Sequence, residues 1–348
     1  MRHKSSARVS GGVFGGVLGG VILGVVFLMW SASPAIAASG WSSKIVGNPA
    51  DVVRPTTGLW VAQGGGTDVD ENFRRMGAAS GGGDFVVIRF GGTDAYNPYI
   101  LSLCSCDSVE TIIFKNKNAS SDPVVAQKIR NAEALFIAGG DQSNYVNLWK
   151  DTPIEDAINF VASKPAPIGG TSAGMAVMSQ FLNSATGRYT LTSSMALANP
   201  FDPNLTLDRN FLALAGLEGI ITDQHLIERD RIGRTMAFLA RLVHDGWTSD
   251  GKAIAADRET TALVNPANRN VQVIAVPGHP TPYVYFMRTP GQPEICQPGT
   301  PLTFRNVSIY RIGPGGTFDL DNWHGTGGIA YTLSAEAGVL VSSRGDIY

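Results

Sequence analysis

The stretch Gly170-Thr171-Ser172-Ala173-Gly174 constrains the fold more than any other part of this sequence. It follows a short apolar run, residues 166–168, and precedes small apolar residues. The pattern G-x-S-x-G predicts a nucleophile elbow, in which a strand passes sharply into a helix and exposes the serine hydroxyl. The flanking glycines are needed because the tight turn leaves no room for a Cβ atom. The Ala173 N–H, at the start of the new helix, is then placed to stabilise an oxyanion. The competing interpretation is a Gly-rich turn with a solvated serine.

Apolar runs alternate with helical patterns before this turn. Residues 59–62, 85–90, 111–114 and 134–138 are largely apolar segments, and three of them run into Gly-rich turns. Continuous apolar strands separated by helices are typical of an α/β fold with a mostly parallel sheet covered by helices on both faces. Active sites in such sheets gather at the carboxyl ends of the strands. We therefore expect the Gly-rich turns to surround one crevice that contains Ser172.

Changes in composition divide the chain into four segments. From Pro277 onward the sequence becomes Pro/Gly-rich with short β runs. We predict a signal peptide at 1–37, a leader at 38–57, a catalytic domain at 58–276 and a β-rich C-terminal extension at 277–348. The glycine run 64–66 has no following Gly-Lys-Ser/Thr, so it does not predict a phosphate-binding loop.

The first residues have the features of an export signal. Basic residues at positions 2, 4 and 8 precede an uncharged apolar run from Gly11 to Trp30, and Ala35-Ile36-Ala37 follows. This order predicts a signal peptide cleaved after Ala37 and a secreted or periplasmic protein. Because the apolar run is long enough to span a bilayer, an uncleaved anchor is the alternative. Once the leader is cleaved, we expect no stable association with a membrane.

Three cysteines fit an exported protein that does not depend on a disulfide framework. They are Cys104, Cys106 and Cys296. We expect one bridge, between Cys296 and either Cys104 or Cys106. No cysteine lies in a Gly-rich elbow, and a C-x-C pair without a nearby histidine lacks the usual zinc spacing. Neither a catalytic cysteine nor a metal site is predicted.

A serine at its ordinary pKa needs a base, which in turn needs an orienting acid. Of the histidines after the leader, His225 follows an apolar strand end, where a side chain can reach the crevice. His244 ends the amphipathic segment 228–244, where a structural role is expected. His279 lies between prolines, and His324 lies in the C-terminal segment. His225 is therefore the predicted base.

Carboxylates that follow strand-like segments are candidates for the acid. Glu259 lies between the strand-like residues 253–256 and 261–264, and Asp257 competes with it. Asp141 follows Gly139-Gly140, where an aspartate most often caps the next helix.

Four motifs in this order resemble the cyanophycinases. They are residues 138–142, 170–174, 223–234 and 259–262. The cyanophycinases belong to a serine peptidase family on the class I glutamine amidotransferase-like fold, which also contains the aspartyl dipeptidases. The resemblance covers residues 59–276, and it leaves the leader and the C-terminal segment outside the shared core.

The resemblance implies a catalytic triad of Ser172, His225 and Glu259, which needs no metal or organic cofactor. It implies an oxyanion hole formed by the backbone N–H groups of Ala173 and Gly140. The residues that it implies for substrate binding are Gln142, Asp223, Gln224, Arg229, Arg231 and Arg234.

The implied substrate is cyanophycin, a poly-aspartate backbone with arginine amide-linked to each side chain. Cleavage of the backbone would release β-Asp-Arg dipeptides. Alternatives are an aspartyl or isoaspartyl dipeptidase-like enzyme without polymer activity, or a non-catalytic binding module on the same fold. The family also implies a homodimer. With 27 basic and 29 acidic residues, nothing in the sequence predicts nucleic-acid binding.

Overall fold

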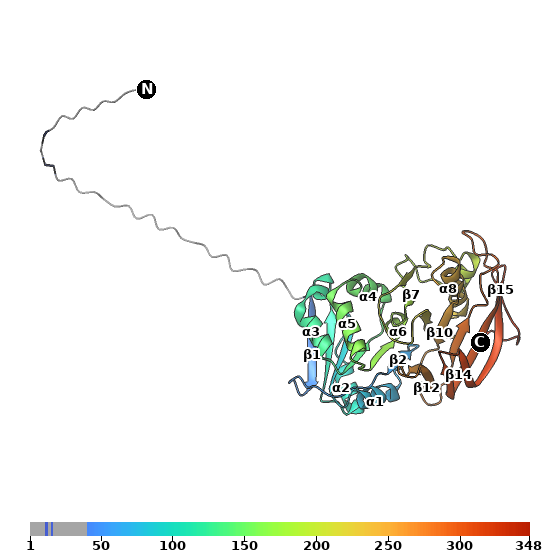
Figure 1. The fold of residues 1–348 in the computed structure, drawn as a ribbon, viewed down its shortest axis with the longest axis horizontal. Coiled ribbons are helices and arrows are strands. Elements are labelled where there is room, and N and C mark those ends of the chain that lie inside the picture. Colours follow the sequence, from blue (N-terminus) through green and yellow to red (C-terminus); the bar gives the residue numbers. More distant parts are fainter. Residues whose placement is uncertain (1–10, 13–14, 17–39) are drawn as a thin grey trace, which may run out of the picture. The chain divides into compact units, whose positions relative to one another are not determined.

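The computed structural model describes residues 11–12, 15–16 and 40–348. Apart from those two glycine pairs, the predicted signal peptide lies outside the described residues. Residues 40–348 belong to one compact unit (Figure 1). Among the residues that the structure describes, no helix is both long and apolar enough to cross a membrane.

Five parallel strands form the centre of the sheet in the order β4–β3–β5–β6–β2. They are β2 (Trp60–Gln63), β3 (Asp84–Phe90), β4 (Ser108–Phe114), β5 (Ala134–Ile137) and β6 (Ile168–Thr171). Every residue of β2, β5 and β6 is buried. Burial at successive positions requires cover on both faces of the sheet, because side chains alternate between the faces.

Helices provide that cover. On one face lie η1 (Lys117–Ser121), α3 (Pro123–Asn131), α4 (Gln142–Trp149) and α5 (Pro153–Ser163), and on the other lie α1 (Asp70–Ala79) and α2 (Tyr96–Cys104). Val86 and Ile88 of β3 belong to the first of these apolar cores, and Phe85 and Val87 belong to the second. The predicted α/β fold, a sheet with helices on both faces, is confirmed.

The second half of the chain extends the sheet beyond β2. Its elements are α6 (Ala173–Ala176), β7 (Phe181–Asn183), α7 (Ser193–Ala198), β8 (Leu207–Arg209), β9 (Ile220–Asp223), α8 (Ile232–His244), β10 (Lys252–Ala256), β11 (Thr260–Val264) and β12 (Asn270–Ala275). Strand β11 pairs antiparallel with β2, whereas β9 pairs parallel with β10 on one side and with β7 on the other. Helix α8 begins at Ile232, not at Glu228 as the apolar spacing predicted, because residues 226–230 form turns first.

The C-terminal segment is β-rich, as expected. It contains β13 (Val284–Arg288), β14 (Phe304–Asp319), β15 (His324–Glu336) and β16 (Val339–Ser342). These strands continue the central sheet, because β13 pairs with β10 and β14 pairs with both β12 and β13. The predicted leader also joins the sheet, since β1 (Trp41–Gly47) pairs antiparallel with β4.

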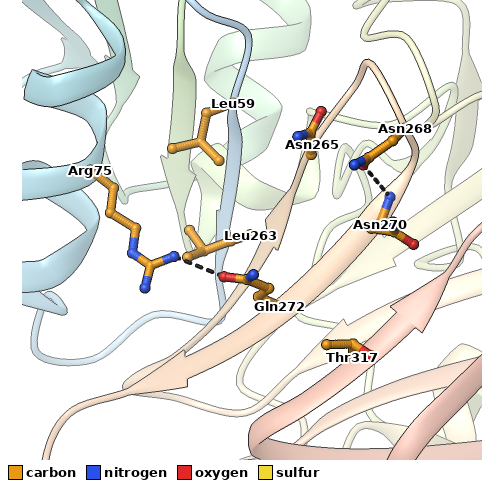
Figure 2. A pocket seen from close by; sticks show the side chains of 8 residues that line it. All are labelled: Leu59, Arg75, Leu263, Asn265, Asn268, Asn270, Gln272 and Thr317. Atoms are coloured by element: carbon orange, nitrogen blue, oxygen red, sulfur yellow. Dashed lines mark hydrogen bonds between the residues drawn. The ribbon is translucent and has the colours of Figure 1, made fainter.

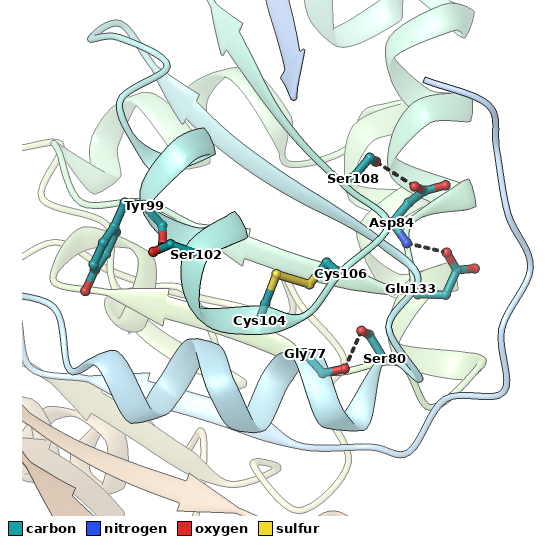
Figure 3. The surroundings of a disulfide bond; sticks show 9 residues. All are labelled: Gly77, Ser80, Asp84, Tyr99, Ser102, Cys104, Cys106, Ser108 and Glu133. Carbon is teal, nitrogen blue, oxygen red and sulfur yellow. Dashed lines mark hydrogen bonds between the residues drawn. A yellow bond between two sulfur atoms is a disulfide. The ribbon is translucent and has the colours of Figure 1, made fainter. Parts of the chain in front are cut away.

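The disulfide joins Cys104 to Cys106 (Figure 3). The predicted bridge to Cys296 was therefore wrong. Cys104 ends α2, and the left-handed Ser105 (φ 52°) turns the chain so that the two neighbouring sulfur atoms meet. Cys296 is a free thiol in a different apolar core, the one around α8 and the C-terminal strands, where burial raises its pKa to about 11.

Candidate active site

Ser172 lies at the turn between β6 and α6 with φ 51° and ψ −113°. This left-handed φ is a strained conformation for a residue with a side chain. The glycines on both sides make it possible: a Cβ atom on Gly170 would lie 2.5 Å from the Gly174 carbonyl carbon, and one on Gly174 would lie 2.0 Å from the Ile137 oxygen. The predicted strand–turn–helix geometry is present, and it presents Ser172 at the end of the parallel sheet.

His225 follows β9 and reaches the serine. Its Nε2 atom lies 2.9 Å from Ser172 Oγ. The His225 side chain is largely buried, and its backbone N–H donates to the Gly64 carbonyl (2.8 Å). The structure therefore brings together the predicted serine and the predicted histidine, which are far apart in the sequence.

Gly65, the middle residue of the glycine run 64–66, lies against the imidazole of His225. A Cβ atom on Gly65 would lie 2.2 Å from His225 Nε2, so only glycine fits beneath the ring. Gly65 has φ +107°, and its carbonyl accepts the Glu259 N–H at 2.6 Å. Sequence analysis excluded a phosphate loop here but missed this role, because only the close approach of residue 225 reveals it.

The carboxylate at the other ring nitrogen is Glu228, not Glu259. Glu228 Oε2 lies 2.5 Å from His225 Nδ1. Glu259 instead accepts from the Thr67 hydroxyl (3.0 Å) and lies 3.2 Å from His279 Nδ1. Glu228 therefore occupies the position at His225 Nδ1 that was predicted for Glu259. The physical reason is the tight turn after His225, which folds the carboxylate three residues later back onto the ring.

Asp257, the competing candidate for the acid, holds that turn in place. Its Oδ1 accepts the backbone N–H groups of Ile227 (3.0 Å) and Glu228 (3.1 Å).

Asp141 caps α4 by accepting the Ser143 N–H at 2.9 Å, which is the helix-capping role that the sequence favoured.

The groups proposed for the oxyanion hole lie beside Ser172. A Cβ atom on Gly139 would lie 3.6 Å from Ser172 Cβ, and Ala173 begins α6. The Tyr145 hydroxyl donates to the Ala138 carbonyl (2.8 Å) and anchors the loop that carries Gly140. Within residues 40–348, neither the Gly140 nor the Ala173 N–H donates to a protein acceptor. Both remain available for a substrate oxygen.

A cleft of about 340 Å³ opens from Ser172. Five of the six predicted substrate-binding residues line it, namely Gln142, Gln224, Arg229, Arg231 and Arg234, and so does Gly140. Arg188, which sequence analysis did not single out, is a further lining residue. A second pocket, of about 390 Å³, contains none of the predicted site residues; Figure 2 shows Arg75 donating to Gln272 across it (2.9 Å).

Asp223, the sixth predicted residue, is engaged within the protein. Both of its carboxylate oxygens bind the Arg234 guanidinium, with Arg234 Nε 3.0 Å from Oδ2. Although burial opposes ionisation, Arg234 holds the pKa of Asp223 below its usual value. The pair is almost fully buried, so Asp223 orients Arg234 and is not itself among the groups that line the cleft.

Arg231 is held differently. Its Nη1 donates to the side-chain and backbone oxygens of Gln224. Burial and the nearby Arg234 lower the Arg231 pKa to about 9, which still leaves it charged at neutral pH. No carboxylate among the described residues forms an ion pair with Arg231 or Arg188. The cleft therefore offers positive charge to a ligand.

Comparisons with known proteins identify peptidases as similar proteins. Residues 101–247 match the model of Peptidase family S51. A cyanophycinase from Geminocystis herdmanii is 22% identical over 227 residues, covering 63% of this chain and 74% of the relative. One from Trichormus variabilis is 26% identical over 158 residues, covering 45% of this chain and 47% of the relative. Over residues 101–247 the chain is similar to Peptidase family S51. It is a serine-type peptidase.

A solved structure supports the fold. The crystal structure of a peptidase from an acI-B1 Actinobacterium has a TM-score of 0.51 and 13% identity, covering 76% of this chain and 98% of that one. The family match includes Ser172, His225 and Glu228 and ends before Glu259.

Replacing Gly65 tests the packing beneath the imidazole. We expect Gly65→Ala to displace the His225 ring and to lower the rate of Ser172 labelling by a fluorophosphonate at least about 100-fold, because the base loses its geometry. Gly91→Ala is the matched control: Gly91 also has positive φ (+67°), but an added Cβ meets nothing within 4 Å. If the labelling rate falls equally in both variants, backbone strain alone explains the loss.

The environment of His225 predicts the acid side of the pH profile. Burial, opposed by the hydrogen bond to Glu228, lowers the His225 pKa below 6.5. A base is active only when neutral, so activity falls as the pH drops through this pKa. We expect the acid limb of the labelling rate to have its midpoint below pH 6.5. A midpoint above that value would contradict the buried environment seen here.

Proposed function

We propose that this peptidase is exported and cleaves the aspartyl backbone of cyanophycin, releasing β-Asp-Arg dipeptides through an acyl-enzyme on Ser172. The observation that carries the proposal is the 2.9 Å contact between Ser172 Oγ and His225 Nε2 at the floor of an arginine-lined cleft. The substrate class is suggested by the cyanophycinase relatives.

The proposed chemistry has two steps. Ser172 Oγ attacks the aspartyl carbonyl carbon while its proton passes to His225 Nε2, and the oxyanion binds the N–H groups of Ala173 and Gly140. The C–N bond then breaks as the proton moves to the leaving amine. Water attacks the acyl-enzyme with His225 again as base, which releases the acid product and restores the serine.

The positive charge of the cleft suits the carboxylates of the proposed substrate. Each residue of cyanophycin carries the α-carboxylate of its attached arginine, and a guanidinium can bind a carboxylate through two parallel hydrogen bonds. Arg229 is half-exposed beside Ser172 in the cleft, and Arg188 is exposed. Both side chains are exposed and can move onto a substrate, although Arg229 also lies 4.0 Å from Glu228 Oε2. Arg234, in contrast, is fixed by Asp223.

The direct test is release of β-Asp-Arg from purified cyanophycin. We expect wild-type protein to release the dipeptide and Ser172→Ala to lose at least about 10⁴-fold in rate, since removal of a serine nucleophile abolishes the acyl-enzyme route. Ser163→Ala, which removes an exposed hydroxyl at the end of α5, is the control.

Two other outcomes would redirect the proposal. If wild-type protein leaves the polymer intact but hydrolyses aspartyl or isoaspartyl dipeptides, the enzyme is a dipeptidase. If Ser172→Ala retains full activity on cyanophycin, Ser172 is not the nucleophile.

Export is tested by the N-terminus of the mature protein. We expect protein recovered from a bacterial host to begin at Ala38, because Ala35-Ile36-Ala37 has the small-x-small pattern of a cleavage site. Strand β1 starts at Trp41, so this cut would leave the first strand whole. Ala37→Arg should block cleavage, and the intact mass of the recovered protein would show this. If wild-type protein keeps its first 37 residues, the result favours the alternative, in which this segment remains as an uncleaved membrane anchor.

A further inference from the structure

We infer that Glu228 is the positioning acid of His225, and that Glu259 belongs to a separate buried pair with His279. The inference rests on the proposed hydrolase chemistry and adds to it a residue that the cyanophycinase resemblance does not assign.

Glu228 has the contact that an orienting acid needs. Its Oε2 lies 2.5 Å from His225 Nδ1, on the opposite side of the ring from Ser172. A carboxylate there accepts the Nδ1–H, so the Nε2 lone pair faces the serine hydroxyl. The same charge stabilises the imidazolium that forms when His225 takes the serine proton.

The charges around Glu228 keep it ionised. Although burial opposes ionisation, the hydrogen bond to His225 and the guanidinium groups of Arg229 and Arg258 lower the Glu228 pKa. Arg229 Nε lies 4.0 Å from Glu228 Oε2. The groups that act on His225 itself are Glu228, Arg229 and Arg231, and the two arginines disfavour its protonation.

The backbone holds Glu228 in this position before any substrate binds. Asp257 Oδ1 accepts the Glu228 N–H at 3.1 Å, and the Arg229 N–H donates to the His225 carbonyl at 3.1 Å. The Arg231 N–H closes the turn on the Leu226 carbonyl at 2.8 Å. A preorganised turn lowers the entropic cost of keeping the acid on the ring.

Glu259 is occupied by other partners. Its Oε1 accepts from Thr67, and its Oε2 faces His279, whose Nε2 lies 3.6 Å from Asp257 Oδ2. The His279 side chain is almost fully buried between the two carboxylates. The Glu259 backbone N–H binds the Gly65 carbonyl. Glu259 therefore holds Gly65 behind the imidazole through its backbone, and its side chain does not contact the imidazole.

The two roles differ in what they do to His225. Loss of the Glu228 charge removes a group that raises the His225 pKa, so that pKa should fall further. Glutamine can also present its NH₂ group to Nδ1 and favour the wrong tautomer, the change that makes an Asp→Asn substitution in a serine protease triad costly. Loss of the Glu259 charge leaves the Nδ1 partner in place.

The test compares Glu228→Gln and Glu259→Gln in the mature chain, with Glu336→Gln, an exposed glutamate on β15, as control. The first readout is the His225 titration and tautomer by imidazole NMR, which requires no turnover. The second is the pH dependence of Ser172 labelling by a fluorophosphonate. We expect Glu228→Gln to lower the His225 pKa and to move the acid limb of labelling to lower pH. The labelling rate should fall about 10²- to 10⁴-fold. Glu228→Asp should restore part of the rate.

A lowered His225 pKa and shifted acid limb in Glu259→Gln, with neither change in Glu228→Gln, would overturn the assignment and return the acid role to Glu259. The NMR readout separates this result from failure of the proposed function. If the wild-type protein shows the Glu228-dependent titration but does not cleave cyanophycin, the substrate proposal fails and the assignment of Glu228 stands.

Discussion

The active site depends on backbone segments that approach more closely than a side chain would permit. Gly170 and Gly174 let the strand β6 turn into α6 beside β5, and Gly65 lets the imidazole of His225 lie flat against the chain after β2. A Cβ atom at any of the three would clash at 2.0–2.5 Å. Glycine at these points places Ser172 and His225 at hydrogen-bonding distance, and the rest of the site follows from that contact.

Around this contact the protein arranges its charges in two layers. The outer layer lines the cleft with arginines, of which Arg188 and Arg229 are accessible to a ligand. The inner layer consists of carboxylates that hold neighbouring groups in place: Asp223 fixes Arg234, and Asp257 fixes the turn that carries Glu228. Buried charges are tolerated when each has a partner, as in the Asp223–Arg234 pair, whereas Arg188 and Arg229 are exposed to solvent.

Much of the site could be predicted from local patterns. The G-x-S-x-G turn identifies Ser172 because its chemistry is contained in five consecutive residues, and a histidine after an apolar strand identifies His225. The orienting acid could not be found this way. Glu228 and Glu259 are both carboxylates beside a strand end, and only the turn at 225–230 decides which of them meets Nδ1.

The order of apolar runs and glycine turns was enough to predict an α/β sheet with a site at the strand ends. A strand that is buried on both faces consists mostly of apolar residues, so each strand can be recognised separately in the sequence. Pairings between segments that are distant in the sequence have no such local pattern. The entry of β1 and β13–β16 into the central sheet and the packing of Gly65 on His225 both depend on where loops bring the chain. A linear pattern records which surfaces are apolar, whereas contacts between separate segments depend on how those surfaces pack together.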